Sequence, residues 1–313
     1  MKISFICNSF LALPSAQLLH EASALAGLAT SSKNLILSEQ MARFAAEIEV
    51  PYTQITPESI ASDIKEWIQS TNPDAVLVQT FPHLIPATCL DLPPLGFYNI
   101  HPSPLPAYRG PDPIFWQLAH NEKTCGVTLH KMGSTFDTGP ILHIESIPVD
   151  PKDTYGLVQS NLSFAAVEAL KYLLSCANPE EQLVPQTAEL ASTQAKPHTQ
   201  DLIIEWADSP AHSIEALVRA CNPHQNGAIT FFRDVMTRVL EANLVTLDRV
   251  PKLPAGSVIA ADDERGLLVI CSDELALQLN LLHVEEGYYT GRRFCEVFKV
   301  GLGEKFCNPA FLS

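Results

Sequence analysis

The 313-residue sequence predicts an α/β region with a mostly parallel sheet, followed by a small β-barrel. In the first half, short apolar runs alternate with amphipathic helical stretches, as in a parallel sheet covered on both faces. Residues 177–207 then become rich in Pro, Ser, Thr and Gln, which indicates a linker over the surface. After it, short β-rich runs are separated by turn signals such as Asn226-Gly227, a pattern typical of a barrel. The predicted domains are therefore 1–176 and 208–313, joined by the linker.

The first region begins with a buried strand over Lys2–Cys7. The spacing of apolar residues predicts one helix over Ala16–Leu28 and another over Glu39–Ile48. Thr56 followed by Pro57 predicts the cap and the first residue of a third helix. Strands are predicted over Ala75–Val78, Gly96–Ile100, Val127–Lys131 and Ile141–Val149, and helices over Ile114–His120 and from Asp153 to about Ser175.

The second region begins with a helix over His212–Ala220, preceded by the cap Ser209-Pro210. Its alternating apolar runs predict strands over Ala228–Phe232, Val239–Val245, Gly256–Ala260, Leu267–Cys271 and Leu275–Val284.

The composition indicates an intracellular globular protein. A hydrophobic content of 46% supplies material for cores, and a net charge of −15 opposes broad attraction to nucleic acid. Eight scattered cysteines form no Cys-x-x-Cys pair, which predicts reduced thiols, a cytoplasmic location and no metal site. The apolar N-terminus resembles a secretion signal, but Asn8 and Ser9 interrupt it, which favours a buried strand. No apolar run approaches the ~20 residues that span a bilayer.

Three polar residues stand out as candidates for chemistry. Asn99 and His101 lie two residues apart at the end of a predicted strand, so their side chains point to the same side. An amide can hold a developing oxyanion, and an imidazole can exchange a proton near neutral pH. Asp137 follows on a loop that ends at Gly139. Taken singly, each has a structural explanation: a strand-end hydrogen-bonding pair, or a turn carboxylate that accepts backbone N–H groups.

Taken together, these three residues and the motifs around them resemble the folate-dependent formyltransferase family, typified by methionyl-tRNA formyltransferase. The resemblance rests on Asn99-Ile-His101-Pro-Ser103-Pro-Leu-Pro106, Arg109-Gly110, Gly126-Val-Thr and Asp137-Thr-Gly139, and continues in Val218-Arg-Ala-x-Asn222-Pro223. It implies a Rossmann-like catalytic domain and an OB-like C-terminal barrel. It also implies transfer of a formyl group from 10-formyltetrahydrofolate to a primary amine, with Asn99, His101 and Asp137 as the catalytic residues.

The resemblance further implies where the pterin binds. In the family, the backbone after one strand and the turn after the catalytic His hold this ring. The corresponding residues here are Phe81, His83, Leu84, Ile85 and Pro86, then Ser103, Pro104, Leu105 and Pro106, together with Gly139. The chain departs from the family at Phe81-Pro82, where an aromatic-Gly pair is usual. Because Pro has a fixed φ and no N–H, this loop must have a different shape.

A second departure concerns the acceptor. The tRNA enzymes carry a loop rich in Gly, Lys and Arg where this chain has Ala29–Glu39, which contains one Lys and no Arg. Residues 201–313 hold ten Lys and Arg against sixteen Asp and Glu, a net of −6. Both features disfavour tRNA and favour an amino sugar, or an amino acid on a small molecule or carrier protein.

Three alternatives stay open at this stage. The chain could be a methionyl-tRNA formyltransferase with unusual electrostatics, or a formyltetrahydrofolate hydrolase, since the His-Pro-Ser and Asp-Thr-Gly-Pro runs also occur in that branch. The Phe81-Pro82 departure motivates a third, a degenerate folate-binding or scaffold module without activity.

Overall fold

The computed structural model describes residues 1–308, which pack into two compact units with interleaved chain segments. The first unit comprises Met1–Pro113, Thr124–Pro148 and Gln159–Ala195. The second comprises Ile114–Lys123, Val149–Val158 and the chain from Lys196 onward. Within residues 1–308, no helix is long and apolar enough to cross a membrane.

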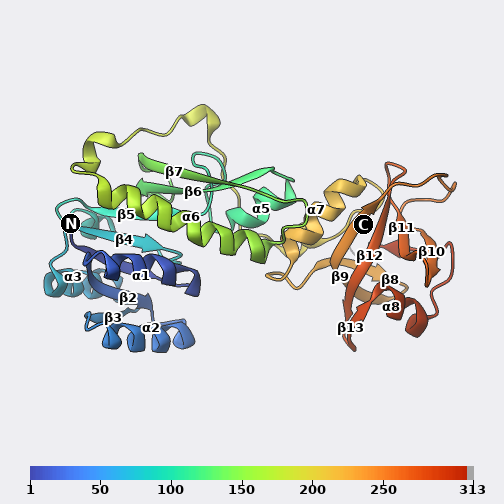
Figure 1. Cartoon of the computed structure of the whole chain (residues 1–313), viewed down its shortest axis with the longest axis horizontal. Helices are drawn as coiled ribbons and strands as arrows, with labels where there is room; N and C mark the ends of the chain where they lie inside the picture. Colours follow the sequence, from blue (N-terminus) through green and yellow to red (C-terminus); the bar gives the residue numbers. More distant parts are fainter. Residues whose placement is uncertain (309–313) are drawn as a thin grey trace. The chain divides into compact units, whose positions relative to one another are not determined.

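A seven-stranded sheet in the order β3-β2-β1-β4-β5-β6-β7 forms the centre of the first unit (Figure 1). Its strands are β1 (Ile3–Cys7), β2 (Leu25–Ser31), β3 (Tyr52–Ile55), β4 (Ala75–Gln79), β5 (Phe97–His101), β6 (Thr124–Lys131) and β7 (Ile141–Pro148). The pairs from β3 to β5 are parallel, whereas β6 pairs antiparallel with both β5 and β7. The predicted mostly parallel sheet is confirmed.

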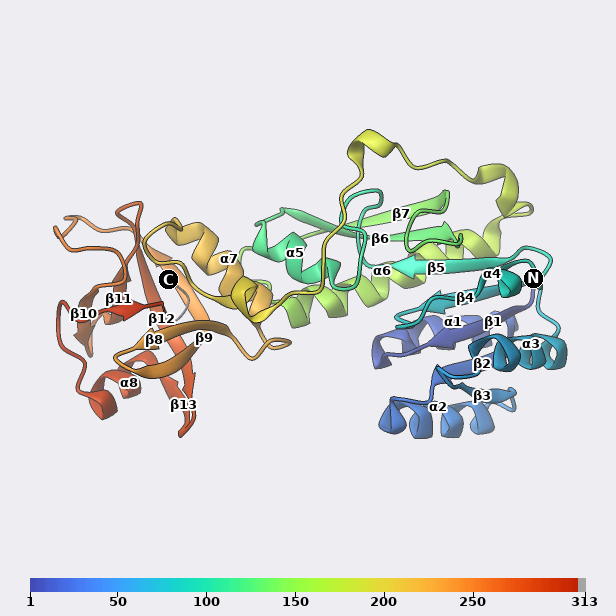
Figure 2. The same cartoon turned by 180° about the vertical axis from the view of Figure 1, so that it is seen from behind.

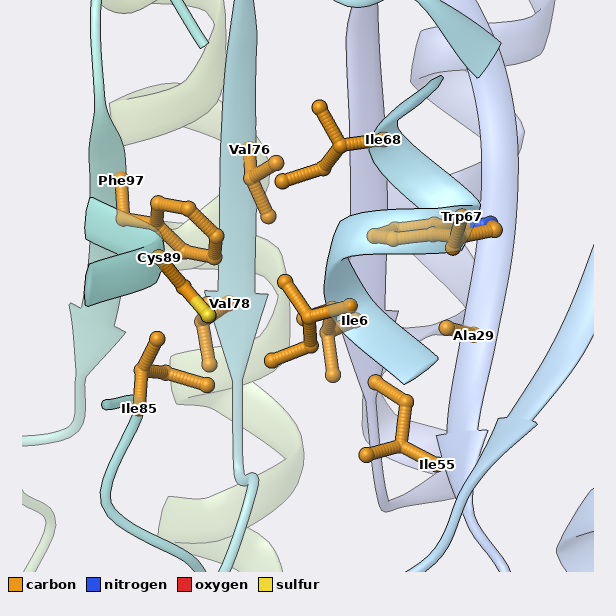
Figure 3. Packing of buried hydrophobic residues seen from close by; sticks show 11 residues of the cluster. Ile6, Ala29, Ile55, Trp67, Ile68, Val76, Val78, Ile85, Cys89 and Phe97 are labelled. Atoms are coloured by element: carbon orange, nitrogen blue, oxygen red, sulfur yellow. The ribbon is translucent and has the colours of Figure 1, made fainter. Parts of the chain in front are cut away.

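Helices cover both faces of this sheet, and Figures 1 and 2 show α3 and α6 on opposite sides of it. The helices that carry residues of this unit are α1 (Leu13–Glu21), α2 (Leu35–Glu47), α3 (Ile60–Thr71), α4 (Ala87–Leu90) and α6 (Tyr155–Ser175). On the α3 side, Trp67 and Ile68 of α3 belong to one buried apolar cluster with Ile6, Val78 and Phe97 of the sheet (Figure 3). Burial of this face fixes which residues of β5 point toward α3, because side chains alternate along a strand.

Two local predictions are wrong. The helix predicted over Ala16–Leu28 ends at Glu21, since Ser23 adopts a left-handed φ of 53° and the chain then enters β2. Leu28 is fully buried there, so its apolar character reflects a central strand. Helix α3 begins at Ile60 instead of Pro57. The backbone N–H and hydroxyl of Thr56 both donate to the Asp63 carboxylate, which ties the preceding loop to the helix.

An antiparallel sheet dominates the second unit, in the order β10-β11-β12-β9-β8-β14, with β13 paired to β12. Ser257 and Lys305, next to its two end strands, form an antiparallel bridge, so the sheet curls back on itself as a half-barrel. The strands are β8 (Ala228–Phe232), β9 (Val235–Val245), β10 (Val258–Asp262), β11 (Gly266–Ile270), β12 (Ala276–Val284), β13 (Gly287–Thr290) and β14 (Phe306–Cys307). The other helices are α5 (Pro113–Ala119), α7 (Ala211–Cys221) and α8 (Gly291–Phe298). Of these elements, β13, β14 and α8 were not predicted from the sequence.

Candidate active site

The end of β5 places Asn99 and His101 on the sheet face that α3 covers. Asn99 pairs in register with Val78, and Phe97 of the same strand belongs to the apolar cluster. Both polar residues therefore follow Phe97 at a spacing of two along that face. His101 is 5% exposed, so its imidazole lies in a largely water-free environment.

Asp137 approaches His101 from the loop between β6 and β7. Its Oδ1 lies 3.4 Å from Nδ1 of His101, and its Oδ2 accepts the Gly110 backbone N–H at 3.0 Å. Asp137 has a left-handed φ of 55°, which aims the carboxylate at the strand end. Gly139 permits this loop, because a Cβ there would lie 1.8 Å from the carbonyl oxygen of Lys131.

Both ring nitrogens of His101 face oxygen atoms. Nε2 lies 3.0 Å from the carbonyl oxygen of Tyr108, which can only accept, while Nδ1 faces Asp137. A carbonyl oxygen can only accept, so Nε2 is the donor in this contact, and the Asp137 carboxylate lies beside the other nitrogen. His101 therefore has an oxygen neighbour at each ring nitrogen, which fixes the orientation of the ring.

A second buried histidine, His130 of β6, completes the cluster and was missed by the sequence analysis. Its Nδ1 donates to the Lys131 carbonyl oxygen at 3.0 Å, so Nε2 is left as an acceptor in the neutral ring. Nε2 lies 3.2 Å from Nδ2 of Asn99 and 3.9 Å from Oδ1 of Asp137. His130 thus orients the Asn99 amide and brings it into the same cluster as His101 and Asp137.

Burial, with the neighbouring charge of His101, lowers the pKa of His130 from 6.5 to about 4. The unfolded chain therefore takes up a proton at His130 below about pH 6.5 that the folded protein excludes until about pH 4. His130 therefore adds no pH dependence to the free energy of unfolding above pH 6.5. Below that value, it lowers the free energy of unfolding as the pH falls. We expect it to cost about 2 kcal/mol of unfolding free energy between pH 6.5 and 5.

Urea unfolding of the wild type and of His130→Gln at these two pH values measures that cost. The variant should lose about 2 kcal/mol less than the wild type on acidification. Replacement of the exposed His212 by Gln is the matched control and should leave the wild-type pH dependence unchanged. Equal losses in wild type and His130→Gln would show that His130 is not held neutral by the fold.

The predicted pterin-binding residues lie in two loops. In the loop after β4, Ile85 is 1% exposed and packs into the apolar cluster, whereas Leu84 is 42% exposed (Figure 3). Phe81 and His83 make an edge-to-face contact, with ring centres 5.2 Å apart. Pro86 precedes α4 as its N-cap.

The turn after His101 is held by its own hydrogen bonds and by β6. The Ser103 hydroxyl donates to the Ala107 carbonyl oxygen at 2.9 Å. The hydroxyl of Thr128 donates to the Ser103 carbonyl oxygen and accepts the Leu105 N–H. The carbonyl oxygens of Pro104 and Pro106 accept backbone N–H groups, and the Leu105 side chain is buried. The structure thus fixes this turn next to His101 and leaves its pterin contacts a prediction.

Residues 1–308 contain no group of three or more His, Cys, Asp or Glu that could hold a metal ion. The cluster of His101, His130 and Asp137 is arranged instead as a set of proton donors and acceptors.

Two family profiles match this chain. The profile described as formyl transferase matches residues 20–174, and the profile of the formyl transferase C-terminal domain matches residues 197–294. Methionyl-tRNA formyltransferase of Dictyoglomus turgidum is 30% identical over 276 residues, which cover 87% of each chain.

Solved structures show the same fold. HypX from Aquifex aeolicus in complex with tetrahydrofolic acid has a TM-score of 0.63 at 18% identity, covering 97% of this chain and 48% of its own. The N-formyltransferase from Helicobacter canadensis, in complex with folinic acid and dTDP-3-aminofucose, has a TM-score of 0.66 at 13% identity, covering 92% of this chain and 100% of its own. The extent of the sequence match to the curated relative, together with the two profiles, shows that this chain belongs to the formyl transferase family of enzymes.

Proposed function

We propose that this enzyme transfers the formyl group of 10-formyltetrahydrofolate to a primary amine on a small-molecule or carrier-bound acceptor. The observation that carries the proposal is the convergence of Asn99, His101 and Asp137 at the end of β5, with His130 behind them. An amide donor and an imidazole in one cluster suit a reaction that builds negative charge on a carbonyl oxygen.

The residues fit the bond changes of formyl transfer. The acceptor nitrogen bonds to the formyl carbon, and the bond from that carbon to the folate nitrogen then breaks. The acceptor nitrogen loses a proton and the folate nitrogen gains one, so the reaction needs no oxidant or metal. Asn99 would donate to the oxygen as it becomes negative. His101 would act through Nε2, which must turn from the Tyr108 carbonyl oxygen to the reacting group to pass the proton, while Asp137 stays beside Nδ1.

The loop after β4 offers a buried polar atom to the folate. Nε2 of His83 has no hydrogen-bond partner among the described residues, although it is shielded from solvent. A buried nitrogen of this kind costs free energy unless a ligand or water satisfies it. Pro82 lacks an N–H, so His83 is a better candidate for a polar contact than its neighbour. The folates named in the two solved structures support a folate as the formyl donor.

The charge of the second unit supports an acceptor other than tRNA. Four of its exposed arginines form ion pairs with carboxylates of the same unit: Arg233–Glu304, Arg265–Asp262, Arg292–Asp263 and Arg293–Glu296. Arg238 donates to backbone carbonyl oxygens. Binding to phosphates relies on cations that can displace counterions, and these guanidinium groups are already engaged.

Methionyl-tRNA formyltransferase remains the second candidate, because the curated relative carries that name. The two candidates predict different behaviour with salt. A tRNA acceptor should give an apparent affinity that falls steeply between 50 and 200 mM salt, by about 10³-fold for several phosphate contacts. A small amine that makes no phosphate contact should show little dependence.

An acceptor screen tests the proposed function. The enzyme is given 10-formyltetrahydrofolate with amino sugar nucleotides, free amino acids, carrier-bound amino acids or methionyl-tRNA, and products are detected by mass spectrometry. We expect a formylated amino sugar or amino acid, and no formyl-methionyl-tRNA. Formylation of the charged tRNA, with steep salt dependence, would favour the second candidate. Formate release without an amine would identify a hydrolase, and folate binding without turnover would identify a scaffold.

A further inference from the structure

The segment Leu183–Gln194, here called the strap, crosses the loops that hold the partners of His101. Figure 1 shows it after the end of α6, arching past β7. It is anchored on β7 by Val184 and Ile141, whose backbones exchange two hydrogen bonds of 2.8 Å. We propose that the strap positions the catalytic histidine and that Gln186 is its central positioning residue, an inference that rests on the proposed function.

Gln186 uses both ends of its amide to connect two loops. Its Nε2 donates to the backbone carbonyl oxygens of Asp137 and Gly139, at 2.8 Å each. Its Oε1 accepts from Nε and Nη2 of Arg109, at 3.1 and 2.5 Å. One side chain therefore ties the Asp137 loop to the turn that follows His101.

A second group of contacts lies at the far end of the strap. The Ser192 hydroxyl accepts the Tyr108 N–H at 2.9 Å, and the Ser192 carbonyl oxygen accepts the Arg109 N–H at 2.9 Å. The Gln194 N–H returns a bond to the Arg109 carbonyl oxygen at 2.8 Å. The backbones approach so closely that a Cβ on Gly110 would lie 2.2 Å from the Gln194 carbonyl oxygen.

The two residues that the strap holds are the two that contact the ring nitrogens of His101. Tyr108 supplies the carbonyl oxygen at Nε2, and Asp137 supplies the carboxylate at Nδ1. Both adopt left-handed backbone conformations, with φ of 59° and 55°. A residue other than Gly keeps such a conformation only where its surroundings enforce it. The hydrogen bonds of the strap hold Tyr108 and Asp137 in these conformations. The strap thereby positions the two groups that contact the His101 ring.

The test compares Gln186→Leu with Gln182→Leu, which makes the same change at an exposed position just before the strap. With saturating 10-formyltetrahydrofolate and the acceptor from the screen, kcat should fall at least tenfold in Gln186→Leu, since small misplacements of catalytic groups are costly. The KM for folate should change less than threefold. Gln182→Leu should match the wild type.

Nuclear magnetic resonance of ¹⁵N-histidine-labelled protein supplies a readout that needs no turnover. The ring ¹⁵N signals of His101, assigned with His101→Gln, should coincide in the wild type and in Gln182→Leu. In Gln186→Leu the Nδ1 signal should shift, because Asp137 is no longer held beside it. Wild-type kcat and His101 signals in Gln186→Leu would overturn the proposal. An inactive wild type whose His101 signals still respond to Gln186→Leu would instead overturn the proposed function alone.

Two more variants guard against a folding defect. Gln186→Glu keeps an acceptor for Arg109 but cannot donate to Asp137 and Gly139, so it should also shift the Nδ1 signal. Ser192→Ala removes only the hydroxyl acceptor for Tyr108 and should shift the Nε2 signal. The thermal unfolding midpoint is recorded for each variant. If the Gln186 and Ser192 variants are folded and all keep the wild-type Nδ1 and Nε2 signals, the strap does not position His101.

Discussion

Replacement of His101 by Gln is expected to lower kcat/KM for formyl transfer by about 10²- to 10⁴-fold, the range for loss of a general acid–base residue. Gln fills a similar space and can donate one hydrogen bond, but it cannot exchange a proton. The loss should appear mainly in kcat, because the imidazole acts on the oxygen and proton of the reacting group. Steady-state kinetics with 10-formyltetrahydrofolate and the identified acceptor measure it.

The matched control is His143→Gln on β7, where the imidazole bonds Glu145 at 3.0 Å and stacks on Tyr172. It removes the same chemical group from the same sheet but away from the cluster, so turnover should stay within twofold of the wild type. Turnover by His101→Gln at the wild-type rate would remove this residue from the proposed chemistry.

Replacement of Asn99 by Ala is expected to lower kcat by about 10²- to 10³-fold, the cost of one lost oxyanion donor. The amide has two N–H groups, of which one is directed to Nε2 of His130, leaving the other for the substrate oxygen. Since the donor matters most when the oxygen is negative, kcat should change far more than KM. Saturation kinetics for both substrates separate the two constants.

Asn161→Ala, at an exposed position on α6, is the control for Asn99→Ala and should behave as the wild type. The double variant Asn99→Ala with His130→Gln provides a further check. Because His130 acts by orienting Asn99, its removal should cost little once Asn99 is gone. Full additivity of the two losses would mean that His130 has a separate role.

The sequence predicted the candidate catalytic residues and determined the sheet. Asn99 and His101 could be assigned to one face of a strand, because the strand period of two is a local property. Apolar runs predicted β4, β5 and the half-barrel strands β8 to β12 to within a few residues, since burial leaves a direct signature in composition. The motifs that contain Asn, His and Asp also led to the family that the profile match identifies.

The sequence was less informative where a segment is apolar for more than one reason. Leu25 and Leu28 continue the spacing of the preceding helix, yet they belong to β2. Periodicity cannot distinguish a buried strand from a helix face over such a short run. Likewise, Thr56 and Ser59 are both residue types that commonly cap helices, and in the structure Ser59 is the N-cap of α3.

Only the tertiary structure decided which distant residues share the site. His130 lies opposite Asn99 because β6 joins the sheet antiparallel to β5, a pairing that no local pattern encodes. In the sequence, Gln186 is an ordinary polar residue of a predicted surface linker. Its contact with the Asp137 loop exists only because the folded chain returns over that loop. Local preferences act over a few residues, whereas these contacts depend on how whole strands and loops pack. For that reason the candidate catalytic residues could be found in the sequence, whereas the residues that position them could not.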